Sequence, residues 1–468
     1  MGFVLSVLYF VVNYLTPHVI FGQLAVARVE LILAILILLV SLPRLTGSYI
    51  FKTPQSVALA GLMFAVVLSV IIGQHWPGRA IQAFLGVIPC IYAYFLICLH
   101  CNSRARFRVL VLMLLFVCLF VIVNGYIDLS QGVPESGPPL SASTGNINPN
   151  IWSMQHPYLL PTTNLFGEQV YRLRGQGLIN DPNDFGQLLV CVIPLMFIFW
   201  RAKKMFRNIV FVALPVCALL FGVYLTHSRG ALLALLAVVI MAVRRRTGTL
   251  PALLIAGVLF FAAMATNFTG GRDISVSAGS DRTVLWGTGL QILKAHPLFG
   301  VGIGYFADSC ADCGHTAHNS LVVCAAELGM FGLFFWCMFL FSSVRDALEI
   351  DSPAKVSEAG QTTQVAKLYA PGERKMEEID KAEINRLGRL LVLSLTGFLV
   401  AGWFLSRAYV MTFFLLGGMV EVAYEMALQR GMVAPRMRLS RVLKYTGGLA
   451  ISLIILMYIM LRTVNLMH

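Results

Sequence analysis

The sequence contains few charged residues for its length. Of its 468 residues, 12% are Asp, Glu, Lys or Arg and 58% are hydrophobic, and the mean hydropathy is +0.79. Soluble domains carry about 25% charged residues, so this scarcity excludes an ordinary soluble protein. Apolar runs of roughly 17 to 22 residues recur along the chain, a length that matches the hydrocarbon core of a bilayer. We therefore expect an all-α, polytopic integral membrane protein, with residues 1–468 forming a single transmembrane domain.

Two further features are scarce. The first apolar run lacks the basic segment and the small-residue cleavage site of a secretory leader, so we expect it to remain as a membrane segment. Acidic residues number 22 against 35 Lys and Arg, which gives a formal net charge of +13. In a membrane protein such a basic excess marks the cytoplasmic loops, and we therefore expect membrane lipids rather than nucleic acid as partners.

Hydropathy predicts about 12 to 13 transmembrane helices. They are expected at residues 3–20, 25–42, 56–73, 80–99, 107–124, 185–200, 208–226, 230–243, 249–266, 319–342, 388–405, 408–426 and 445–461. Basic clusters lie on alternate connections, at residues 103–108, 201–208, 244–246 and 434–444. The positive-inside rule assigns these connections to the cytoplasm.

The remaining polar segments follow from this topology. The connections 125–184 and 267–318 become two long loops on the outer side of the membrane, and loops of this length are often functional. The insertion 346–387 is expected in the cytoplasm, where its alternating charges at helical spacing predict a solvated or interfacial helix.

Arginine is scarce on the predicted outer side. The arginines found there include Arg172, Arg174, Arg229, Arg282 and Arg407. The planar guanidinium suits phosphate and carboxylate groups, and an ionisable residue at the mouth of a membrane helix indicates a functional site. The alternative is snorkelling to lipid headgroups, which we favour for Arg407. Arg229 lies on a very short turn, in THSRGALLALL, and for it we favour a functional role.

The segment NDPNDFGQLL allows two interpretations. Asn183 and Asp184 can cap the helix that follows, because short polar side chains accept hydrogen bonds from the first turn. Alternatively, Asp181, Asn183 or Asp184 hydrogen-bonds a sugar. Either way, we expect the segment to lie at the membrane surface.

Cysteine and histidine gather in the segment CADCGHTAHNS. Cys310, Cys313, His315 and His318 are zinc-ligand types, but they fall within nine residues. Such close spacing would strain a tetrahedral site, since structural zinc sites join ligand pairs that lie further apart. We therefore predict no metal site. Outside the cytoplasm a disulfide between Cys310 and Cys313 is more plausible, with free thiols as the other possibility.

His318 directly precedes an apolar run, and Asn319 or Ser320 can cap the helix that begins there. Histidine titrates near neutral pH, so a neutral imidazole can accept a proton, and nearby arginines would favour that neutral form. Taken alone, His318 could also be a structural histidine.

Arg282 begins an amphipathic stretch. Trp286, Leu290 and Leu293 share one face of it, which predicts an interfacial helix. The GVGIG run that follows is not a P-loop, because no Lys-Ser/Thr comes after it.

Five segments of the chain together resemble the O-antigen ligase family. AHNSLVVCAAELG, with ten residues between His318 and Gly329, and RGALL, which begins at Arg229, resemble the two signature motifs of this family. RGQGLINDPNDFGQLL, DRTVLWGTGLQI and HPLFGVGIGYF resemble segments that the family shares with O-antigen polymerases. The resemblance covers residues 170–340. The CADC element and the insertion 346–387 are departures from the motif core of the family.

The resemblance implies a GT-C-like glycosyltransferase of the bacterial inner membrane, with its active site at the periplasmic face. The donor would be a glycan on undecaprenyl pyrophosphate. The acceptor would be a lipid A–core sugar in a ligase and a growing glycan in a polymerase. The implied reaction is inverting and uses neither metal nor cofactor. A polytopic transporter is the alternative from another class, although transporters concentrate ionisable residues near span centres rather than at one membrane face.

The resemblance also implies roles for individual residues. His318 would be the general base or would orient the acceptor. Arg174 and Arg229 would hold the pyrophosphate, and Arg282 would support the donor or the catalytic loop. Further candidates for substrate contact are Arg172, Asn183 and Asn319.

Overall fold

The computed structural model describes residues 1–17, 28–45, 49–131, 156–271, 277–310, 316–351 and 371–466. The chain divides into two compact units. Unit 1 consists of residues 1–43, 104–279 and 396–405, and unit 2 consists of residues 44–103, 280–395 and 406–468. Because the units alternate along the chain, no single cut in the sequence separates them.

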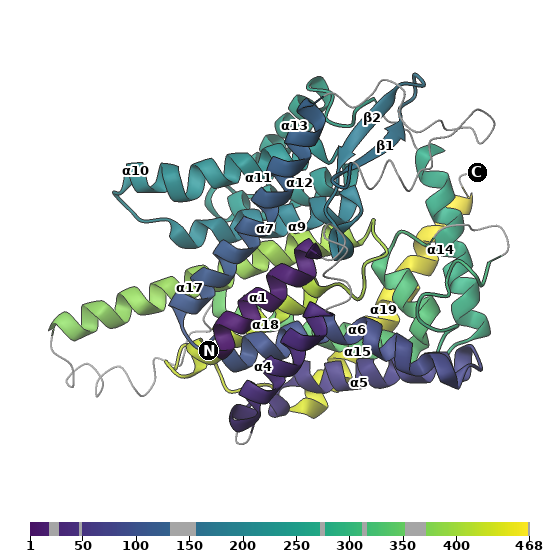
Figure 1. Cartoon of the computed structure of the whole chain (residues 1–468), viewed down its shortest axis with the longest axis horizontal. Helices are drawn as coiled ribbons and strands as arrows, with labels where there is room; N and C mark the ends of the chain where they lie inside the picture. Colours follow the sequence, from purple (N-terminus) through teal and green to yellow (C-terminus); the bar gives the residue numbers. More distant parts are fainter. Residues whose placement is uncertain are drawn as a thin grey trace. The chain divides into compact units, whose positions relative to one another are not determined.

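Unit 1 holds the helices of the first and middle parts of the chain and the two strands (Figure 1). Its elements are α1 (Gly2–Leu15), α4 (Val29–Leu45), α7 (Arg104–Ser130), β1 (Leu159–Thr163), β2 (Gln169–Leu173), η3 (Gly177–Ile179), α9 (Pro182–Leu195), η4 (Met196–Phe199), α10 (Met205–Asn208), η5 (Ile209–Ala213), α11 (Leu214–Leu225), α12 (Arg229–Thr247) and α13 (Thr249–Ala265).

Unit 2 holds the other helices (Figure 1). Its elements are η1 (Tyr49–Lys52), α5 (Pro54–Leu68), η2 (Ser69–Gly73), α6 (Pro77–His100), most of α14 (Ser277–Ala295), α15 (Ser320–Asp351), most of α17 (Pro371–Gly402), α18 (Met411–Leu428) and α19 (Leu439–Leu466). α5 shows why such helices begin where they do. Thr53 caps its first turn by accepting a hydrogen bond from the Ser56 amide at 3.2 Å, and Pro54 occupies the first helical position.

The helices confirm an all-α, multi-pass membrane protein. A helix lies at each of the thirteen expected places, and nine helices of the described residues are long and apolar enough to cross a membrane. α1 and α13 are apolar but shorter. In the predicted cytoplasmic insertion 346–387, residues 352–370 lie outside the described residues. The charged stretch that begins at Pro371 is continuous with the next span, and the two form the single helix α17.

A β-hairpin lies in the segment predicted as the first long loop. β1 and β2 are antiparallel, with Leu159 opposite Leu173 and Thr163 opposite Gln169 (Figure 1). Asn164 builds the turn, because its side-chain oxygen accepts hydrogen bonds from the amides of Phe166 and Glu168, each at 2.9 Å. Asn side chains stabilise turns in this way. The hairpin leads the chain to the start of α9.

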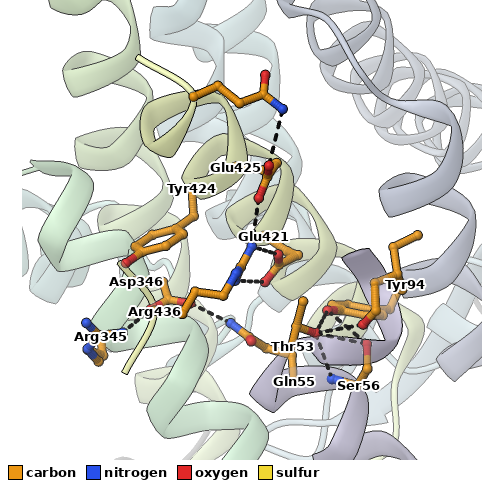
Figure 2. Close-up of polar contacts among 12 residues, drawn as sticks. Thr53, Gln55, Ser56, Tyr94, Arg345, Asp346, Glu421, Tyr424, Glu425 and Arg436 are labelled. Carbon is orange, nitrogen blue, oxygen red and sulfur yellow. Dashed lines mark hydrogen bonds and ion pairs between the residues drawn. The ribbon is translucent and has the colours of Figure 1, made fainter. Parts of the chain in front are cut away.

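Buried charges gather at the C-terminal end of α18 in unit 2 (Figure 2). Arg436 pairs with both Glu421 and Glu425, with Nη1 to Glu421 Oε2 at 3.1 Å and Nη2 to Glu425 Oε2 at 3.1 Å. We call these three residues the Arg436 cluster. Nearby, Gln55 Nε2 donates to Asp346 Oδ2 at 2.7 Å. Glu421 is fully buried, and a buried carboxylate requires such a partner. The cluster therefore fastens the segment after α18 to that helix.

Candidate active site

The side chain of Arg172 forms hydrogen bonds to other residues of unit 1. It lies on β2 and is 3% exposed. Its Nε donates to the Thr226 carbonyl and its Nη2 donates to Asn183 Oδ1, both at 2.9 Å. Asn183 Oδ1 also accepts a hydrogen bond from Ser228 Oγ at 2.8 Å. These contacts tie β2 to the start of α9 and to the turn before α12.

Arg174, two residues further along, differs from Arg172. Its amide donates to the Tyr158 carbonyl at 2.9 Å, but its side-chain Nε is buried and has no hydrogen-bond partner among the described residues. Burial lowers the pKa of the Arg174 guanidinium, and the nearby carboxylate of Asp181 opposes that shift. A buried cation with an unused donor can bind an anionic group.

The start of α9 corrects one expectation. Asp181 is the N-cap, and its Oδ1 accepts a hydrogen bond from the Asn183 amide at 2.7 Å. Asn183 and Asp184 therefore lie within the first turn and are not the cap. The side chain of Asn183 is instead used by Arg172 and Ser228. The sequence carried the correct signal, because Pro182 favours the first helical position and so places the cap at Asp181.

Arg229 is the first residue of α12 and is half-buried. Ser228 caps this helix by accepting a hydrogen bond from the Ala231 amide at 3.3 Å. The preceding residue, His227, has a φ of 48° and lies 2.7 Å through Nδ1 from the Phe268 carbonyl. The N-terminus of a helix carries partial positive charge, so Arg229 adds a full positive charge at a position that already favours anions.

His318 lies directly before α15 in unit 2 and is half-buried. Its φ of 49° is in the left-handed region, which is costly for a non-glycine residue. Two contacts hold the backbone there: the His318 amide donates to Ser406 Oγ at 2.7 Å, and the Trp286 indole donates to the Ala317 carbonyl at 2.8 Å. The backbone at His318 is therefore held from α14 and from the segment before α18.

Asn319 confirms the expected cap of α15. Its Oδ1 accepts hydrogen bonds from the amides of Leu321 and Val322, at 2.9 and 3.1 Å. Asn319 is fully buried, and its Nδ2 has no hydrogen-bond partner among the described residues. The side chain thus stabilises the helix through one atom and retains an unused donor on the other.

α14 contains the amphipathic stretch within the second outer loop that was predicted to form an interfacial helix. Arg282 lies in its first half and is half-buried. Of the predicted apolar face, Trp286 and Leu293 are buried, at 6% and 7% exposure, and Leu290 is half-buried. Because Trp286 also holds the Ala317 carbonyl, α14 supports the residue before His318.

The GVGIG run forms a fixed turn against α15, which we call the glycine loop (residues 300–304). Gly300, Gly302 and Gly304 have φ values of 66°, 97° and 74°, which only glycine adopts readily. Gly329, with φ 65° and ψ −170°, interrupts α15 at this level. The Val301 amide donates to the Ala326 carbonyl at 3.0 Å and the Gly302 amide to the Glu327 carbonyl at 2.9 Å.

Glu327 was not predicted as a site residue. It is 3% exposed, and its carboxylate accepts hydrogen bonds from the amides of Gly304 and Phe306. The side chain therefore fixes the far end of the glycine loop. The available signal was a single carboxylate inside the otherwise apolar run 319–342, where a charged residue requires a partner.

Cys310 takes part in a disulfide. Cys313 and His315 lie outside the described residues. Among the residues that the structure describes, no three His, Cys, Asp or Glu side chains gather as metal ligands would. The reaction without metal or cofactor stays a prediction.

The helices define a multi-pass membrane protein, and polar or charged side chains lie at the starts of α12 and α15. Residues 214–337 match the family model described as O-antigen ligase. This match supports the family resemblance over residues 214–337, and the family described by that model implies a glycosyltransferase-type enzyme. The matched stretch includes Arg229, Arg282, His318 and Asn319, whereas Arg172, Arg174 and Asn183 precede it. None of the curated proteins compared with the chain matches it.

Proposed function

We propose that the protein is an inverting, metal-independent O-antigen ligase, which moves a glycan from undecaprenyl pyrophosphate to a lipid A–core sugar at the periplasmic face of the bacterial inner membrane. The observation that carries the proposal is the restrained backbone of His318 within the matched ligase domain. Positions held in the left-handed region at a backbone cost are concentrated at functional sites.

In the proposed reaction, His318 accepts the proton of the acceptor hydroxyl while the hydroxyl oxygen attacks the anomeric carbon. The bond between that carbon and the pyrophosphate oxygen breaks, and the pyrophosphate-lipid leaves with the electron pair. Arg174 and Arg229 stabilise the negative charge that develops on the leaving group, as fixed cations do in metal-free transfer. The unused Nε donor of Arg174 supports this role.

The other candidates receive supporting roles in the proposal. Asn319 offers its unused Nδ2 donor to the substrate. Arg282 supports the donor or the loop that contains His318. Arg172 and Asn183 position their neighbours rather than bind substrate, because their polar atoms are bonded to Thr226, Ser228 and each other.

The test is a transfer assay with purified protein in detergent. The protein receives an undecaprenyl-pyrophosphate glycan and a lipid A–core acceptor, with and without EDTA. We expect transfer to continue with EDTA. His318→Asn should reduce the rate roughly 10²- to 10⁴-fold, the range that a general base contributes. Asn is the conservative choice because it also tolerates a positive φ.

His315→Asn is the matched control, since it removes a histidine from the same loop and should leave the rate within about twofold of the wild type. Normal turnover by His318→Asn would contradict the base assignment. Loss of activity with EDTA would contradict the metal-free mechanism. Transport of a glycan into proteoliposomes without any transfer would favour a transporter instead.

The lipopolysaccharide profile of a deletion strain distinguishes ligase from polymerase. A ligase deletion leaves the core without O-antigen. A polymerase deletion leaves a single repeat unit on the core, and that result would assign the protein to the polymerases that share its motifs.

A further inference from the structure

A cavity in unit 2 is lined by none of the residues used in the proposed reaction. It has a volume of about 770 Å³ and is lined by the turn between η2 and α6, by one face of α14 and by the segment that contains the glycine loop. Its polar and aromatic lining consists mainly of Gln74, Trp76, Thr288, Gln291, His296 and Tyr305. The volume is within the range of ligand pockets, about 300 to 1,000 Å³.

The lining mixes polar and apolar side chains and contains no Asp, Glu, Lys or Arg among the described residues. Amide, hydroxyl and imidazole groups both donate and accept hydrogen bonds, and a neutral polyhydroxyl ligand requires both. Two aromatic rings add apolar faces. This chemistry fits a saccharide better than a phosphate or a lipid chain, because a phosphate needs cations and a lipid chain needs a continuous apolar wall.

Gln74 gives the second, independent indication of a ligand. Both its Nε2 and its Oε1 are buried, and neither has a hydrogen-bond partner among the described residues. The Gln74 amide packs closely against Gly302, since a Cβ added at Gly302 would lie 2.2 Å from the Gln74 Nε2. An unpaired buried amide destabilises the fold unless another molecule completes its bonds.

Two aromatic rings line the cavity. Trp76 is 57% exposed on the turn before α6. Tyr305 is half-buried, and the Arg79 guanidinium lies 4.2 Å from the centroid of its ring, which restrains the orientation of the ring. Apolar faces of sugar rings pack on such aromatic faces, while the tryptophan keeps its polar edge for hydrogen bonding.

We propose that this cavity is a saccharide-binding subsite, which holds part of the transferred glycan or of its acceptor through Gln74, Gln291 and the rings of Trp76 and Tyr305. The inference rests on the proposed glycosyltransferase function and adds a substrate contact that neither His318 nor the arginines supply. The donor glycan and the acceptor core share this sugar chemistry, and the test separates them.

Two soluble probes are titrated into the full-length protein in detergent by calorimetry: a lipid-free core oligosaccharide and a lipid-free O-antigen repeat oligosaccharide. We expect one of them to bind. Gln74→Ala and Trp76→Ala should each weaken that binding roughly tenfold, and should raise KM for the same sugar in the transfer assay with kcat changed less than about twofold. Gln291→Ala provides a third variant on the surface of α14 if either of these fails to fold.

Tyr458→Ala is the matched control, because Tyr458 is an aromatic residue of similar exposure (55%) on α19 and does not line the cavity. His318→Asn should bind the probe as the wild type does. Absence of binding by both probes, or equal binding by Trp76→Ala and Tyr458→Ala, would overturn the subsite while transfer by the wild type leaves the proposed function intact. Binding that depends on Gln74 without any transfer would support the subsite and overturn the proposed function.

Discussion

The Arg436 cluster differs from Arg174, Asn319 and Gln74 in how its buried polar groups are bonded. Arg436 is bonded to two carboxylates, Glu421 and Glu425. Arg174 Nε, Asn319 Nδ2 and the Gln74 amide atoms are also buried but have no partner among the described residues. A paired group contributes to the stability of the fold, whereas an unpaired one reduces it until a ligand binds. The difference separates residues that hold the structure from those we expect to bind substrate.

The largest expected effect comes from breaking the paired region. Arg436→Met leaves Glu421 buried without a cation, and removing one partner of a buried ion pair costs about 3–5 kcal/mol. We expect a clear fall in the thermal unfolding midpoint of the detergent-solubilised protein. The double variant Arg436→Met, Glu421→Gln should recover a large part of the loss. An unchanged midpoint in the single variant would show that the cluster does not stabilise the fold.

The next-largest expected effect is the difference between substitutions at Arg172 and at Arg174, which are two residues apart. Arg172→Met should lower stability, because two hydrogen bonds of a buried cation are lost. Arg174→Met should leave the unfolding midpoint near that of the wild type but raise KM for the lipid-linked donor roughly 10- to 100-fold, the range of a charged hydrogen bond of about 1.5–3 kcal/mol. Parallel unfolding and donor-titration measurements check both. The opposite assignment of effects would reverse the roles of the two arginines.

The smallest expected effect distinguishes the helix cap formed by Asn319 Oδ1 from the hydrogen-bond donor offered by Asn319 Nδ2. Serine also caps helices, so Asn319→Ser should keep the cap and lose only the amide donor. We expect stability near that of the wild type and a transfer rate lowered by about tenfold or less, the value of one neutral hydrogen bond. Asn319→Ala should lose about 1 kcal/mol of stability as well. Equal activity of Asn319→Ser and the wild type would show that Nδ2 does not contact substrate.

Much of the fold could be predicted because membrane spans have a direct hydropathy signal. Each expected span corresponds to a helix, and the start of α15 follows from the capping chemistry of Asn319. The hairpin was missed because strands of five residues in a polar loop give a weak signal. The cap at Asp181 was available in the sequence, from the proline that follows it, but the later polar residues were favoured.

The partners of individual site residues could not be predicted. Arg172 and Arg174 look alike in the sequence, and only the position of Thr226, more than fifty residues away, shows that Arg172 is used internally. Glu327 accepts hydrogen bonds from the segment of the glycine loop, and α15 is kinked nearby at Gly329. Neither feature can be seen in the sequence of an apolar run. Gln74 is a candidate only because Gly302 lies against it. Each of these contacts depends on segments that are far apart in the chain.

The kink at Gly329 also has a consequence for motion. A break in a membrane helix exposes backbone groups that lipid cannot satisfy. Here the segment before α15 supplies the missing bonds: Val301 and Gly302 donate to carbonyls of α15, and the Met330 and Phe331 amides donate to the carbonyls of Pro297 and Leu298, at 2.8 and 3.1 Å. We therefore expect the glycine loop and the kinked helix to open as one cooperative unit, with their amides protected together from hydrogen exchange.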